Sequence, residues 1–148
     1  MTEEDKKLLL KDLSTRLPYG VKAYVKNWSK LDRKYYEGVY TVESTHPSLN
    51  TVLACSDKGS VEVIVGYDDY EIKPYLFPLS SMTEEIMDEI YTTTGVYDIS
   101  IDSSVHIEAG TTFEDLTKIF DILHKHQIDY RGLIEKGLAI DATGLNVY

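Results

Sequence analysis

The sequence predicts an α+β protein, in which three main helices pack mostly on one face of an antiparallel sheet of about four to five strands. Three segments carry apolar residues at helical spacing, and several short runs of alternating apolar residues follow one another between residues 21 and 65. The connections between these runs are short, which favours antiparallel pairing. With 148 residues, the chain is expected to form a single domain, residues 1–148, around one hydrophobic core.

The first predicted element is a helix that begins after Thr2 and ends near Arg16. Thr2 is a suitable N-cap, and the acidic residues 3–5 suit the positive end of the helix dipole. Pro18 disfavours a helical conformation at the residue before it, so the helix is expected to stop there. Its buried stripe is predicted to consist of Leu9, Leu10, Leu13 and Leu17.

Four strands are predicted in the next part of the chain, over residues 21–26, 38–43, 51–55 and 60–65. The apolar residues of the first strand alternate, so they share one face of the sheet: Val21, Ala23 and Val25. Between the last two strands, residues 56–59 have the chemistry of a hairpin turn because Gly59 can adopt a positive φ. The order favours an antiparallel meander.

Two further helices are predicted in the second half of the chain. Each opens with a capping box, Ser81–Glu84 in one case and Thr111–Glu114 in the other. The first is expected to end before Gly95 and the second near His126. Between these helices, residues 96–107 are expected to form one or two strands.

The remaining segments carry weaker signals. Residues 72–78 are expected to be extended, but Pro74 and Pro78 predict an edge strand or a loop. Residues 133–136 are predicted to form a short helical turn. The tail, residues 144–148, is expected to fray because it contains little that would hold it.

Composition narrows the class of protein. A single cysteine, Cys55, excludes an internal disulfide and a cysteine-based zinc site. The chain contains neither an apolar run of about 18 residues for a membrane span nor a readable signal peptide, so we expect a cytoplasmic protein away from membranes. The net charge is −10, and residues 51–100 hold 2 basic and 10 acidic residues. This charge disfavours non-specific binding to nucleic acid.

No sequence pattern marks an active site. The chain lacks a phosphate-binding loop, a dinucleotide-binding glycine motif and a nucleophile elbow. His124 and His126 are two residues apart on a predicted helix, so their side chains point about 200° apart and cannot chelate one ion. We interpret both as cations that stabilise the end of the helix. We expect no catalytic residue, no metal and no cofactor, with an enzyme of unrecognised class as a remaining alternative.

Tyrosine is enriched, since 12 of the 16 aromatic residues are Tyr. Tyrosine offers a large contact area at a low cost in side-chain entropy, which favours it at protein interfaces. A tyrosine-rich acidic patch suits a basic protein partner, so the leading hypothesis is a non-catalytic, protein-binding protein. The alternative is a purely structural role, in which these rings cap the open end of a small core. The candidate partner-binding residues are Tyr67, Asp68, Asp69, Tyr70 and Tyr75.

Residues 22–30 suggest a second function. Cations alternate with aromatic rings on one face of the first strand, and this pattern is typical of single-stranded nucleic-acid binding, in which rings stack on bases and cations hold phosphates. The same pattern also stabilises an ordinary exposed sheet face, because lysine stems cover aromatic rings. The nucleic-acid-binding candidates are Lys22, Tyr24, Lys26, Trp28 and Lys30.

Three segments carry a family resemblance: LPYGV at residues 17–21, IKPYLFPLSSMTEE at residues 72–85 and DYRGLIEKGLA at residues 129–139. Together they resemble a group of small proteins from gut bacteria of the Bacteroides type, often found in prophage-like regions, to which no function has been assigned. The resemblance implies an accessory protein of a phage or mobile element. Such proteins act by binding more often than by catalysis, and the resemblance carries over no catalytic residue.

Overall fold

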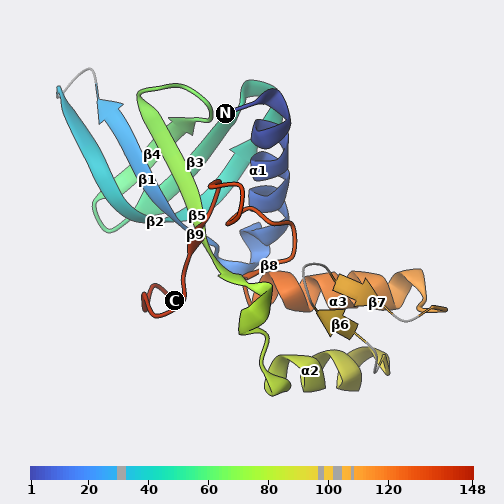
Figure 1. The fold of residues 1–148 in the computed structure, drawn as a ribbon. Helices are drawn as coiled ribbons and strands as arrows, with labels where there is room; N and C mark the ends of the chain where they lie inside the picture. The colour runs from blue at the N-terminus through green and yellow to red at the C-terminus, as the bar shows by residue number, and fades with distance from the viewer. Residues whose placement is uncertain (30–32, 97–98, 102–104, 108) are drawn as a thin grey trace.

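The computed structural model describes residues 1–29, 33–96, 99–101, 105–107 and 109–148 (Figure 1). Within these ranges the fold is α+β, as predicted. Its helices are α1 (Glu3–Arg16), α2 (Glu84–Thr94) and α3 (Phe113–Lys125), and its short 3-10 turns are η1 (Leu17–Tyr19), η2 (Pro47–Leu49) and η3 (Leu79–Ser81). No helix in the described ranges is long and apolar enough to cross a membrane.

The main sheet is mixed, and it has more strands than the sequence predicted. Seven strands take part, in the order β4-β3-β2-β1-β5-β8, with β9 also paired to β5. Strands β1–β5 pair in antiparallel fashion, whereas β8 and β9 run parallel to β5. The strands are β1 (Lys22–Ser29), β2 (Lys34–His46), β3 (Thr51–Ser56), β4 (Gly59–Ile64), β5 (Tyr70–Pro78), β8 (Ile128–Asp129) and β9 (Ile140–Asp141), and a separate hairpin holds β6 (Ile99–Ile101) and β7 (Val105–Ile107).

Strand β5 lies between β1 and β8 in the strand order, so the prediction of a loop at residues 72–78 was wrong. The predicted edge character holds at residues 72–74, which pair with β1 alone, whereas residues 75–78 pair with β9 and β8. Trp28 N donates to Asp69 O at 3.1 Å, and the register continues from there along β1. Because hydrogen-bonding residues alternate along an antiparallel strand, residues 71 and 73 face β1 and Pro74 faces the other side. There β9 pairs only from Tyr75 onward, so the missing N–H of Pro74 interrupts no strand pairing.

Helix α1 covers one face of the sheet and closes the larger hydrophobic cluster. Asn27 Nδ2 on β1 donates to Glu62 O on β4 at 3.1 Å, so the sheet curls until its edge strand β4 reaches across to β1. The alternation predicted for the first strand is confirmed, since its apolar residues are fully buried under α1. This cluster includes Leu9, Leu13, Val21, Ala23, Val25, Val52, Ala54, Val63, Ile72, Leu76 and Leu133.

Helices α2 and α3 pack on each other rather than on the sheet, and they lie beside its lower end in Figure 1. They close a second cluster, made of Ile86, Ile90, Val96, Ile119, Ile122, Leu123 and Ile128. The expectation of one core, with the helices mostly on one face, was therefore wrong in this respect. Because each helix has an apolar stripe, a helix pair satisfies the pattern as well as a helix on a sheet does.

The helix boundaries agree with the sequence to within a few residues. Thr2 caps α1, as predicted, and it does so in a capping box with Asp5 that the sequence analysis did not predict; α2 and α3 end where expected. The predicted caps of α2 and α3 were displaced: Thr83 caps α2 in place of Ser81, and Thr112 caps α3 in place of Thr111. Ser81 instead belongs to η3, which continues β5 before the helix begins.

The tail is docked against the sheet, contrary to the expectation that it frays. Tyr148 Oη donates to Tyr75 O at 2.8 Å and accepts from Lys22 N at 3.2 Å. Lys22 Nζ also donates to Val147 O at 2.5 Å. The tail therefore bridges the first residue of β1, Lys22, and the second half of β5, at Tyr75. The hydrogen bonds of the Tyr148 hydroxyl hold the tail, and no local sequence pattern predicts them.

Candidate protein-binding surface

The turn between β4 and β5 borders a surface hollow of about 310 Å³. Four of the five predicted partner-binding residues line it, and the outer face of β1 and β2 contributes Lys26 and Tyr35. Tyr67 is 65% exposed, although burying an aromatic ring is favourable. The hollow is lined by Met1, Lys26, Tyr35, Gly66, Tyr67, Asp68, Asp69, Tyr70 and Glu71.

Backbone hydrogen bonds hold this turn in place. Tyr70 N donates to Tyr67 O at 3.0 Å, which closes the turn, and Trp28 N donates to Asp69 O, which ties it to β1. Tyr70 is half-buried and packs against the larger hydrophobic cluster. The turn is therefore a fixed platform on which Tyr67 and the two aspartates project.

The charges in the hollow are only partly compensated. Glu71 forms an ion pair with Lys73 at 3.0 Å, and Lys26 Nζ lies 4.7 Å from the centre of the Tyr35 ring. Asp68 and Asp69 are both exposed, and no described residue forms an ion pair with either side chain. The hollow thus offers two carboxylates and two exposed aromatic rings to whatever enters it.

Tyr75, the fifth candidate, is not part of this surface. Its side chain is only 8% exposed, and its backbone pairs with β9 and with Tyr148. Burial raises the pKa of its hydroxyl. Tyr75 lies five positions after Tyr70, and along a strand five positions span about 17 Å, which carries Tyr75 away from the turn. The structure thus keeps four candidates together and removes Tyr75.

The nucleic-acid candidates lie on the face of β1 that no helix covers. Lys22, Tyr24, Lys26 and Trp28 share this face, opposite the buried residues of the strand, and Lys30 lies outside the described residues. The rings of Trp28 and Tyr35 pack with centroids 4.9 Å apart. The predicted row of cations and rings therefore exists over the described part of β1.

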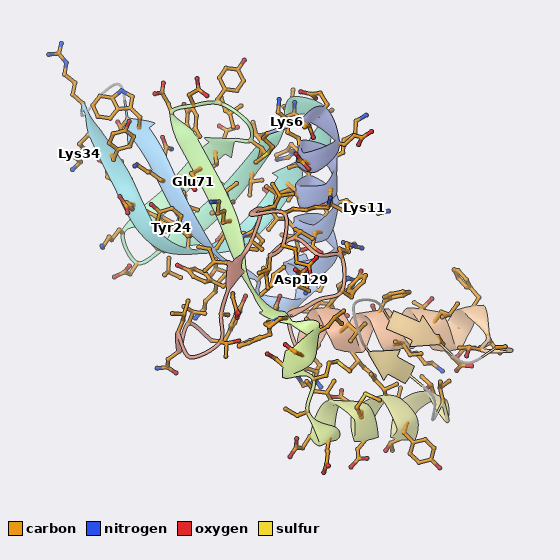
Figure 2. All side chains as sticks on the ribbon, in the orientation of Figure 1. Lys6, Lys11, Tyr24, Lys34, Glu71 and Asp129 are labelled. Atoms are coloured by element: carbon orange, nitrogen blue, oxygen red, sulfur yellow. The ribbon has the colours of Figure 1, made fainter. Side chains whose placement is uncertain are left out.

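Acidic side chains interrupt this row. The register places Lys26 between Glu37 on β2 and Glu71 on β5, and Figure 2 shows Tyr24 and Glu71 on neighbouring strands. Burial and a hydrogen bond to Glu37 raise the pKa of Tyr24 to about 12. Lys22 contacts the tail instead of solvent alone. The face carries mixed charge, which suits cross-strand pairing and weakens attraction for phosphates.

A buried polar network joins the two hydrophobic clusters, and sequence reasoning missed it. Asp12 and Arg16 are both fully buried, and Arg16 Nε donates to Asp12 Oδ2 at 2.7 Å. Arg16 Nη2 donates to Ile128 O at 2.8 Å, and Arg131 also contacts Asp12. The guanidinium and carboxylate groups pair with one another where α1, α3 and β8 meet, beside Asp129 in Figure 2, and among the described residues only Arg16 Nη1 of these groups is buried without a hydrogen-bond partner.

His124 belongs to the same network and is neutral at pH 7. It is 6% exposed, and its Nε2 lies 2.7 Å from Tyr130 Oη. Burial, with help from the nearby charges of Arg16 and Arg131, lowers the pKa of His124 to about 4. The interpretation of His124 as a cation at the helix end was therefore wrong. His126 instead lies 2.7 Å from Glu89 on α2, across the helix pair.

Three segments that are distant in sequence, residues 17–21, 72–85 and 129–139, meet at this network. Gln127 Nε2 donates to Tyr19 O at 3.2 Å, which ties the first segment to the approach to β8. Phe77 pairs with Ile128, and the carboxylate of Asp129 accepts from the backbone of Leu133 and Ile134. These segments thus form the joint between the clusters, which gives them a shared structural role. A single sequence does not reveal that these distant segments contact one another; covariation in an alignment of related sequences is the signal that reveals such contacts.

Other reactive groups in the described ranges have structural partners. Cys55 is half-buried, and its Sγ lies 2.7 Å from Ser60 Oγ. The pKa of Cys55 is raised, chiefly by the neighbouring Glu43 and by burial against the lowering effect of Ser60, which disfavours the reactive thiolate. Among the side chains that the structure describes, no group of three His, Cys, Asp or Glu is placed to hold a metal ion.

Comparison of the chain with protein-family models, curated proteins and solved structures found no match.

Proposed function

We propose that this protein is a non-catalytic accessory protein, derived from a phage or mobile element, that binds a protein partner through the hollow beside Tyr67. The observation that carries the proposal is a fixed turn that projects an exposed tyrosine and two uncompensated carboxylates. Interfaces are enriched in such aromatic anchors, and carboxylates around them select a partner with Lys or Arg at the contact.

The structural alternative, in which the tyrosines cap the core, explains only part of the set of candidate partner-binding residues. It accounts for Tyr70, which packs on the larger cluster, and for the buried Tyr75. It does not account for Tyr67, whose ring covers none of that cluster. We place the partner in the cytoplasm, because a single free cysteine suits a reducing compartment.

Affinity capture tests this proposal. The wild-type chain should recover a stoichiometric protein from a lysate of its native host, and Tyr67→Ala should weaken that recovery about tenfold, as for an interface anchor. Phe113→Ala is the matched control, because Phe113 is 85% exposed at the start of α3, in the other part of the fold. Equal recovery by wild type and Tyr67→Ala, or loss with the control alone, would contradict the proposal.

Single-stranded nucleic acid is the second candidate, and the packed rings of Trp28 and Tyr35 on an uncovered sheet face favour it. Trp28 is the only tryptophan, so its fluorescence reports directly on stacking. Under the leading proposal, oligonucleotides at low salt leave this fluorescence unchanged. Quenching that saturates and disappears as salt rises would favour the nucleic-acid function instead.

A further inference from the structure

Strand β2 is longer than the strand beside it, and this leaves part of one edge free. β2 pairs with β1 from Lys34 to Thr41, whereas β3 joins β2 only from Thr41 onward. Over residues 34–40, no described strand pairs with β2 on the side away from β1. This stretch forms a ribbon with β1 that stands out from the body at the upper left of Figure 1, with Lys34 near its tip in Figure 2.

The register shows which backbone groups face the free edge. Val42 N donates to Val21 O at 2.9 Å, so the even-numbered residues of β2 are those that hydrogen-bond to β1. The N–H and C=O groups of Tyr35, Glu37 and Val39 must therefore point away from β1. These groups repeat every two residues, about 6.8 Å apart, which is the spacing that another strand presents.

A hollow of about 560 Å³ lies over the inner face of the same ribbon. Tyr36 and Tyr40 line it from β2, Tyr70 lines it from β5 and Val61 lines it from β4. Between the two tyrosines of β2, Gly38 has no side chain, and the edge of the Tyr40 ring lies 3.8 Å from the position that a Cβ would take there. A volume of this size accommodates a large side chain, and its aromatic walls favour an apolar or aromatic one.

We propose that an extended segment of the protein partner adds to the free edge of β2 as a further strand, with an aromatic or branched apolar side chain in the hollow that Tyr36 and Tyr40 line. The inference rests on the proposed function, because it takes the partner to be a protein, and Tyr70 lines both hollows. Backbone hydrogen bonds would supply affinity, and the hollow would supply specificity, as in other cases of strand addition.

The flanking charges are those that sheet edges use against self-association. Lys34 and Glu37 are both exposed at the free edge, and charged residues at an edge disfavour indiscriminate pairing. A partner segment can meet them with opposite charges at the facing positions, which selects one sequence over others. These charges therefore disfavour non-specific strand pairing while the backbone of the edge stays accessible.

The test uses a displayed library of random twelve-residue peptides, selected on the immobilised full chain. Selected peptides should alternate apolar residues, and in the isotope-labelled chain they should shift and protect the amides of Tyr35, Glu37 and Val39. Val39→Pro removes one edge N–H without removing a bond to β1, and it should weaken these peptides about tenfold or more. Val39→Thr is the matched control because it keeps the N–H, and it should bind like wild type.

Val39 is 44% exposed, so both substitutions spare the core, and amide spectra will confirm that each variant is folded. Failure to select any peptide, or selection of peptides that bind Val39→Pro as tightly as wild type, overturns the inference. A concentration-dependent increase in mass that Val39→Pro abolishes would show that a second copy occupies the edge, and this also overturns it. If the captured partner no longer binds Tyr67→Ala but still binds Val39→Pro, the edge proposal is wrong and the proposed function is supported.

Discussion

Asp12 accepts a hydrogen bond from Arg131, 119 residues later in the chain, with Arg131 Nη1 2.9 Å from Asp12 Oδ1. The same carboxylate accepts two hydrogen bonds from Arg16. One fully buried acid therefore compensates two guanidinium groups, at the place where the sheet and the helix pair meet. This carboxylate therefore ties α1 to the segment that follows β8.

Asp12→Asn should strongly destabilise the fold. An amide keeps the shape of the side chain but removes the charge, so the fully buried Arg16 is left uncompensated. Breaking one partner of a buried pair costs about 3–5 kcal/mol. Urea unfolding should show this loss in the free energy of unfolding, whereas Glu4→Gln on the exposed side of α1 should change it by less than about 0.5 kcal/mol. Similar losses in the two variants would contradict this account of the network.

His124 should make the protein less stable at mildly acidic pH. Its pKa falls to about 4 in the folded state, from an ordinary value of 6.5, so the unfolded chain binds a proton that the folded chain does not. The stability due to the neutral ring is complete above about pH 6.5 and is lost as the pH falls toward 4. At pH 5, proton linkage for this shift predicts a loss of about 2 kcal/mol in the free energy of unfolding.

His124→Gln isolates this effect, because glutamine does not titrate and can still hydrogen-bond to Tyr130. The stability difference between pH 7.5 and pH 5 should shrink in this variant, as measured by urea unfolding at the two pH values. His46→Gln is the control, since His46 is exposed and should leave the pH dependence unchanged. A pH dependence that His124→Gln leaves intact would assign the effect to other groups.

The sequence predicted those elements whose signals are local. The Thr2 cap and the leucine stripe of α1 lie within a few residues of one another, as do the alternating valines and alanine of β1, and the structure confirms both elements. Only Leu17 departs from the predicted stripe, since it lies in η1 and is half-buried. The turn before Gly59 is likewise local, and it joins β3 to β4 as expected. Where a signal fits within one element, the sequence alone was sufficient.

Features that depend on distant parts of the chain could not be predicted in this way. β8 has two residues, too few to show any alternation, and it exists because Phe77 pairs with Ile128. Asp12 and Arg16 have the spacing of a common surface ion pair, and only the packing of β8 and Arg131 over them makes the pair buried. The four candidates at residues 67–70 were adjacent in sequence, but their neighbours Lys26 and Tyr35 come from other strands.

Tyr148→Phe should loosen the docked tail. The hydroxyl of Tyr148 serves both Tyr75 O and Lys22 N, so its removal leaves two backbone groups with one partner fewer. The expected loss is about 1–2 kcal/mol in the free energy of unfolding, together with faster hydrogen exchange at the amide of Lys22. Tyr67→Phe removes an exposed hydroxyl and should change neither quantity. Unchanged exchange at Lys22 in Tyr148→Phe would mean that the hydroxyl does not hold the tail.

Asp129→Asn should weaken the turn that follows β8. The Asp129 side chain is buried, and its two oxygens accept from Leu133 N at 3.0 Å and from Ile134 N at 2.7 Å. An amide offers one good acceptor in place of two charged ones, so we expect a loss of about 1–3 kcal/mol, with the largest rise in hydrogen exchange at residues 133 and 134. Asp141→Asn is the matched control, because the exposed Asp141 accepts from one backbone N–H, that of Thr143, at 2.9 Å. Since water can replace that exposed acceptor, Asp141→Asn should cost less than half as much, and an equal cost in the two variants would show that burial does not strengthen the Asp129 contacts.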